Sequence, residues 1–222
     1  MDITPDAHVY WSSGFLKVNS TMVYTWFVMI VLVVGSWLIT RRITSDVKIP
    51  RWQNLLETLV GALRNQIRDI SQQPPDRYLP FLGSLFVFIF FANVMAPLPF
   101  YHSPTGSLSL TAALALCVFF AVPIFGIWKR GPLAYFKAYA QPVFFMAPLH
   151  LISEVSRTFS LALRLFGNVM SEGVMIAILL SLVPIILPVV FEMLGLLLGS
   201  IQAYIFFVLA TVYIGAATSG AH

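Results

Sequence analysis

The stretch "SLALRLFGNVMSEG", residues 160–173, places an arginine inside a run that otherwise has the composition of a buried apolar helix. Asn168 follows Arg164 after four residues, and Glu172 follows after four more. At helical periodicity these three polar side chains share one side of a helix. An arginine does not lose its proton in a protein, so position 164 carries a permanent positive charge.

The whole chain has the composition of an integral membrane protein. Its 222 residues are 59% hydrophobic and only 10% charged, whereas a soluble domain carries about 25% charged residues. The formal net charge is +4, but the basic residues lie between hydrophobic stretches, which is a sign of membrane topology and not of nucleic-acid binding. No nucleotide-binding loop, nucleophilic triad or metal-ligand spacing is present, so we expect no cofactor and no bound metal.

Five stretches are long and apolar enough for membrane-spanning helices, which need about 20 residues. Three of them stand alone: 22–40, 80–100 and 107–128. Residues 149–217 form one longer apolar run, and Pro184 and Pro188 divide it into two helices joined by a short turn. The sequence therefore predicts an all-α membrane protein, a single domain over residues 1–222, with a long helical hairpin over 149–217.

A different kind of helix is predicted over residues 50–72, before the second span. Pro50 suits a helix start, and Pro74 and Pro75 end it. Its apolar residues recur at helical spacing: Trp52, Leu55, Leu56, Leu59, Leu63, Ile67 and Ile70. Such a helix lies in the membrane interface, and the alternative is a solvent-facing helix packed on a partner protein.

The distribution of Lys and Arg predicts the orientation in the membrane. Residues 41–79 contain seven of these bases and residues 129–148 contain three, whereas the N-terminal segment contains one, Lys17. We therefore expect the two basic segments in the cytoplasm and residues 1–21 outside. After five crossings the C-terminus is cytoplasmic. The N-terminal segment lacks the basic start of a cleavable signal, so the first span is expected to be retained.

All ionisable groups inside the apolar spans lie in the last third of the chain. They are Glu154, Arg157, Arg164, Glu172 and Glu192. A charge at the centre of the bilayer costs roughly 2.5–3.5 kcal/mol on insertion scales, so such residues are functional candidates. Glu154 lies three residues before Arg157 and can pair with it. Arg164 has no acid at these spacings and needs one from another helix or another chain.

Further polar residues accompany this group on other predicted spans. Gln202 lies on the last helix, beyond a GxxxG pattern at Gly195 and Gly199 that permits close helix approach. Asn93 lies near the end of the second span. For both Gln202 and Asn93 two roles remain open: a hydrogen bond between helices, or a place on a hydrated pathway.

Three motifs resemble a known family. "SLALRLFGN" closely resembles the signature of the a subunit of F-type ATP synthases, the stator half of the membrane ion channel. "IQAYIFFVLATVYIGAA" is similar to the last-helix motif of that family, and "FFANVMAPLPF" to its second-span motif. The resemblance covers most of the chain from about residue 80. It implies a non-catalytic subunit of the Fo sector in a bacterial inner membrane, with the c-ring, the b subunits of the peripheral stalk and the lipid bilayer as partners.

The resemblance also implies roles for individual residues. Arg164 matches the stator arginine that faces the c-ring, with Asn168 and Gln202 as its polar neighbours. Glu172 and Glu192 are similar to the acids of the access half-channels. Many relatives carry an acid or histidine nine residues after the arginine and an ionisable group seven before the glutamine. Here Glu172 is eight after, and Gly195 holds the other position.

Two other functions are compatible with buried charges in a membrane chain. One is a secondary ion-coupled transporter, although such proteins commonly show matched halves, whereas this chain gathers its charges in one third. The other is an assembly scaffold that conducts no ions, whose buried charges would tolerate neutral substitution. The transported ion is taken as H⁺, with Na⁺ left open, because the resemblance places the ion-binding carboxylate on the c-ring.

Overall fold

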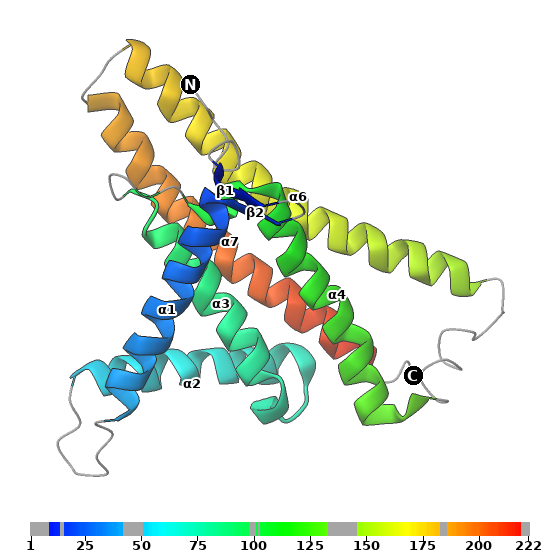
Figure 1. Cartoon of the computed structure of the whole chain (residues 1–222). Helices are drawn as coiled ribbons and strands as arrows, with labels where there is room; N and C mark the ends of the chain where they lie inside the picture. The colour runs from blue at the N-terminus through cyan, green and yellow to red at the C-terminus, as the bar shows by residue number, and fades with distance from the viewer. Residues whose placement is uncertain are drawn as a thin grey trace.

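The computed structural model describes residues 9–13, 16–41, 51–97, 101, 103–132, 146–182 and 186–218. These residues are mainly helical, and the long helices form one bundle (Figure 1). The helices are α1 (Ser20–Thr40), α2 (Arg51–Ser71), α3 (Leu79–Val94), α4 (Leu108–Arg130), α6 (Met146–Leu182) and α7 (Ile186–Thr218), with short 3₁₀ turns η2 (Pro75–Arg77) and η3 (Pro104–Gly106). The predicted all-α membrane architecture is confirmed.

Within the described residues, four helices are long and apolar enough to cross a membrane: α1, α4, α6 and α7. The bounds of α1 and α4 lie within two residues of those predicted. Residues 149–217 divide into α6 and α7 as expected. Pro184 lies outside the described residues, whereas Pro188 is the third residue of α7, in the first turn, where its missing N–H breaks no helical hydrogen bond.

The second predicted span is shorter than expected. The sequence predicts a helix over 80–100, but α3 has 16 residues and ends at Val94, which gives a length of about 24 Å. The N–H of Met95 bonds to the carbonyls of Phe91 and Asn93, which closes the last turn. Pro97 disfavours a helical conformation in the residue before it, so the helix cannot continue.

A small β-hairpin precedes α1 and was not predicted. Strands β1 (Val9–Ser13) and β2 (Leu16–Asn19) pair antiparallel within the segment predicted to be extracytoplasmic. The sequence does hold the signal, because β-branched and aromatic residues flank a Ser-Gly step in "VYWSSGFLKV".

The amphipathic helix α2 lies across the ends of the neighbouring helices (Figure 1). Leu63 and Ile67 on its apolar face are buried in the bundle core, so the second half of this face packs on the chain itself. A Cβ on Gly215 of α7 would lie 3.4 Å from Ser71 at the end of α2. The C-terminal ends of α2 and α7 are therefore on the same side of the bundle.

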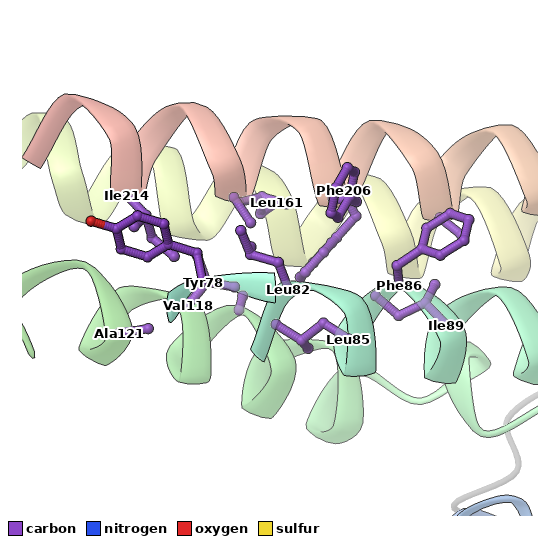
Figure 2. Close-up of a cluster of buried hydrophobic side chains, with 14 of the residues drawn as sticks. Tyr78, Leu82, Leu85, Phe86, Ile89, Val118, Ala121, Leu161, Phe206 and Ile214 are labelled. Atoms are coloured by element: carbon purple, nitrogen blue, oxygen red, sulfur yellow. The ribbon is translucent and has the colours of Figure 1, made fainter. Parts of the chain in front are cut away.

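The core of the bundle is built from α3, α4, α6 and α7, with α2 closing one end. Leu82 and Ile89 of α3, Val118 of α4 and Phe206 of α7 are at most 2% exposed. Figure 2 shows these side chains interleaved with Leu161 of α6. This core fixes the central part of α6, which carries the candidate functional arginine.

Candidate functional site

Arg164 lies near the middle of α6 and is exposed. Its neighbours Leu161 and Leu165 are 2% and 0% exposed and belong to the core, so packing of these leucines turns the arginine to the outside of the bundle. No described carboxylate lies within ion-pair distance of its guanidinium. The structure thus agrees with the expectation that an acid for Arg164 must come from elsewhere.

The polar side chains that follow Arg164 turn towards α7. Steps of four residues advance the direction around a helix by about 40°, so two steps from Arg164 to Glu172 rotate it by about 80°. Asn168 and Glu172 are half-buried, unlike Arg164. A Cβ added to Gly195 of α7 would overlap the carboxylate of Glu172. The stripe predicted from the sequence therefore slants from the outer face of α6 into the contact between α6 and α7.

Glu172 and Glu192 lie on the facing sides of α6 and α7. Glu192 on α7 is near enough for its charge to act on the Glu172 carboxylate. It lies three residues before Gly195, which places it on the same side of α7 as the glycine that Glu172 contacts. The two acids predicted for the pathway are thus brought together.

Asn93 joins α3 to α7 and to η3 through two buried hydrogen bonds. Its Nδ2 donates to the carbonyl of Gly199 at 3.0 Å, and its Oδ1 accepts from Thr105 Oγ1 at 2.9 Å. A Cβ on Gly199 would come within 3.0 Å of the Asn93 Cβ. Asn93 therefore makes the hydrogen bond between helices that was one of its two open roles, and a role on the pathway stays a prediction.

Two amide groups of the predicted site have unused donors. The Nδ2 atom of Asn168 and the Nε2 atom of Gln202 are buried and have no hydrogen-bond partner in the described part of the chain. Gln202 as a whole is 7% exposed. Buried polar groups without a partner are rare in proteins, and water commonly satisfies them. A place of Asn168 and Gln202 on a hydrated route stays a prediction.

Arg157, one member of the upstream pair predicted on α6, contacts α7. The guanidinium of Arg157 lies over the ring of Tyr213, 5.5 Å from its centroid. Glu154 is half-buried one turn earlier. The contact between Arg157 and Tyr213 was not foreseen, because sequence spacing relates residues only within one helix.

The family model described as ATP synthase A chain matches residues 22–215. The chain belongs to this family. The matched range includes every residue of the candidate site, from Asn93 to Gln202. The resemblance inferred from the sequence motifs is therefore confirmed.

Curated members of the ATP synthase A chain family are similar over nearly their full length. ATP synthase subunit a 1 of Crocosphaera subtropica is 55% identical, over 96% of this chain and 93% of the relative. ATP synthase subunit a of Albidiferax ferrireducens is 53% identical, over 99% and 95%. ATP synthase subunit a 1 of Chlorobaculum parvum is 52% identical, over 98% and 96%. The chain is accordingly a multi-pass membrane protein of the ATP synthase Fo sector.

Sequence reasoning missed the residues that contact the polar side chains of the site. Gly195 and Gly199 were expected to let one helix backbone approach another, but each accommodates a polar side chain, Glu172 on Gly195 and Asn93 on Gly199. Thr105 was also missed. It is fully buried, and its hydroxyl donates a hydrogen bond to the side-chain amide oxygen Oδ1 of Asn93. Only the tertiary fold brings these residues, more than ten positions apart, into contact.

Proposed function

We propose that this chain is the ion-translocating stator subunit of a rotary ATP synthase, which delivers protons to and from carboxylates of the c-ring. The observation that carries the proposal is the position of Arg164. It is a permanent cation at the centre of a membrane helix, exposed on the outside of the bundle, and no described carboxylate of its own chain neutralises it. A membrane protein keeps such a charge when a partner supplies the acid.

The proposed mechanism rests on two opposing effects on a ring carboxylate. Facing lipid, the carboxylate stays protonated because burial disfavours its charged form. Opposite Arg164, attraction favours the charged form by about 4 kcal/mol at 4 Å and an effective dielectric of about 20. The proton therefore leaves at the arginine and is regained beyond it. The same fixed cation repels a proton that would leak directly between the two access routes.

The acids and amides inside the hairpin are proposed to form part of the access routes. Glu172 and Glu192 are close enough to interact, and the buried amide nitrogens of Asn168 and Gln202 have no described partner. Each amide nitrogen can donate to a water molecule, and each carboxylate can take up and release a proton. These four residues support a hydrated route that reaches the Arg164 face from one side.

The orientation and partners follow from the same proposal. Residues 1–21 lie outside the cell and the C-terminal end of α7 lies in the cytoplasm of a bacterium, with α2 on the same side, as the contact between Ser71 and Gly215 requires. The c-ring faces Arg164, and the b subunits of the peripheral stalk hold the bundle. Catalysis of ATP synthesis belongs to other subunits. A potential of 100 mV supplies about 2.3 kcal/mol for each charge moved.

Substitution of Arg164 tests the proposal in the assembled complex. We expect Arg164→Ala to abolish ATP-driven proton pumping in inverted membrane vesicles while the subunit remains assembled, because an exposed side chain is lost. Arg164→Lys should also fail, because a lysine can lose its proton in an apolar site. Arg68→Ala, which removes a charge from the exposed face of α2, is the matched control and should pump normally. Coupled pumping by Arg164→Ala at the control rate would refute the proposal and favour a scaffold.

A further inference from the structure

A second cationic site lies at the end of α4, away from the arginine of α6. The guanidinium of Arg77 in η2 lies over the ring of Trp128 in the last turn of α4, 5.8 Å from its centroid. Tyr78, next to Arg77, packs edge-on against Phe125 with ring centroids 5.3 Å apart. These aromatic contacts fix the position of η2 against α4, so the cation and the indole stay together.

The positive charges at this site have no acid of their own. The neighbouring Asp76 is engaged by Arg64 of α2 in an ion pair. Neither Arg77 nor Lys129, the residue after Trp128, has an ion-pair partner in the described part of the chain. Arg130 adds a third cation to the same turn, and its buried Nε and Nη2 atoms lack hydrogen-bond partners among those residues. The partial negative charge of the α4 C-terminus, about half a unit, offsets only a fraction of this charge.

An apolar lane runs along α4 from the same cations towards the middle of the helix. Four side chains at intervals of four residues are exposed: Leu116 (48%), Phe120 (59%), Ile124 (60%) and Trp128 (71%). Residues four apart are neighbours on a helix but rotate by about 40° per step, so the lane covers about three turns, or roughly 18 Å, and winds by about 120° around α4. Cations without an ion-pair partner among the described residues, at one end of such a lane, match the two parts of a phospholipid, its anionic headgroup and its acyl chain.

We propose that this site binds one anionic phospholipid, with its phosphate held by Arg77 and Lys129 and an acyl chain along the lane. Arginine recognises phosphate through paired hydrogen bonds. Tryptophan is enriched where the apolar core of a membrane meets the headgroups, and basic pockets between membrane helices bind anionic headgroups. A free phosphate ion would use the cations but not the lane. The proposal does not depend on ion translocation at Arg164.

The site can be tested by fluorescence quenching in the intact purified complex. Brominated phosphatidylglycerol and brominated phosphatidylcholine are compared as quenchers, and subtraction of a Trp128→Phe complex isolates the signal of Trp128. We expect phosphatidylglycerol to quench this signal at a lower mole fraction than phosphatidylcholine. An Arg77→Gln/Lys129→Gln variant should lose on the order of tenfold in this preference. Arg68→Gln, which removes a charge from the exposed face of α2, should keep the preference.

Each alternative outcome of this experiment decides the proposal. Equal quenching by the two lipids would overturn it, as would a preference that persists in the double variant. If inorganic phosphate at millimolar concentration removes the preference, the ligand is a free anion and not a lipid. If Arg68→Gln loses the preference as well, general surface charge explains the effect. Binding of radiolabelled phosphatidylglycerol to each complex gives the same comparison without relying on Trp128.

Discussion

The carboxylate of Glu172 on α6 fills the space that a side chain on Gly195 of α7 would take. The sequence resemblance implies an ionisable group at the position of Gly195. In this chain the carboxylate at that place comes from the opposite helix, and Glu192 lies close to it. The acid on α6 and the glycine on α7 thus belong to one contact.

Gly195→Ala should displace the Glu172 carboxylate without unfolding the bundle. The overlapping atoms belong to the end of a flexible side chain, which can rotate away at small cost, so we expect normal assembly and slower proton flux. Flux is measured as ATP-driven acidification of inverted vesicles. Normal flux in the variant would show that the position of Glu172 is unimportant for transport.

Gly199→Ala is the matched comparison, because the same change meets a different obstacle. The new methyl group would lie 3.0 Å from the Cβ of Asn93, which is held by two buried hydrogen bonds. Overpacking of this kind costs about 1–3 kcal/mol. We expect a lower midpoint temperature of thermal unfolding for the Gly199→Ala complex than for the Gly195→Ala complex.

Asn93→Ala should destabilise the contact between α3 and α7. The substitution removes the hydrogen bonds of Asn93 to the Gly199 carbonyl and to Thr105 Oγ1, which keeps its contact with Ser103 Oγ at 2.7 Å. Each lost hydrogen bond costs about 0.5–1.5 kcal/mol. Thermal unfolding of the purified complex measures the effect. Ser84→Ala on the same helix removes only an exposed hydrogen bond to Phe81 and should change little. Equal midpoints for the two variants would contradict the assigned role.

Neutral substitution of the paired acids should slow proton flux less severely than loss of Arg164. Gln in place of Glu172 or Glu192 keeps the shape but cannot take up and release a proton. Because the two carboxylates interact, the effects of the single substitutions should not add in the double variant. Flux is followed over the working pH range. Unchanged flux in both single variants would leave these acids a structural role only.

Gln72→Gly should raise the stability of the turn after α2. Gln72 has φ 52°, a left-handed conformation that costs an L-residue roughly 1–2 kcal/mol and a glycine almost nothing. Because the side chain is exposed, its removal loses little packing, and we expect a gain of up to about 1 kcal/mol. Gly131 after α4 has φ 82° and tests the opposite change. Gly131→Ala should lower the midpoint temperature of unfolding, because an L-residue is strained in this conformation.

The sequence was sufficient to predict the elements whose signal is local. The apolar lengths and the positions of Pro50 and Pro74 predicted the outer bounds of α1, α2, α4 and the hairpin to within three residues. The early end of α3 was missed because the stretch stays apolar up to Phe100, although Pro97 already disfavours helix.

In the candidate site, too, the sequence predicts only what depends on local spacing. Periodicity placed Arg164 and Glu172 within about one quarter of the circumference of a helix; in the structure Arg164 is exposed and Glu172 is half-buried against Gly195 of α7. Periodicity does not say which neighbour each side chain meets. The contacts of Glu172 with Gly195 and of Arg157 with Tyr213 depend on the crossing of α6 and α7, and this crossing is set by the shared core.

Gly195 and Gly199 are one helical turn apart on α7. A side chain from a different helix fills the space beside each of them, Glu172 at Gly195 and Asn93 at Gly199. A rotation or shift of α7 would therefore disturb Asn93 and Glu172 together. The stability of the bundle and the position of the acid therefore depend on the same turn of α7. A substitution at this turn should be tolerated only together with compensating substitutions on α3 and α6. Engineering of the acid pair would have to begin with the glycines and not with the carboxylates.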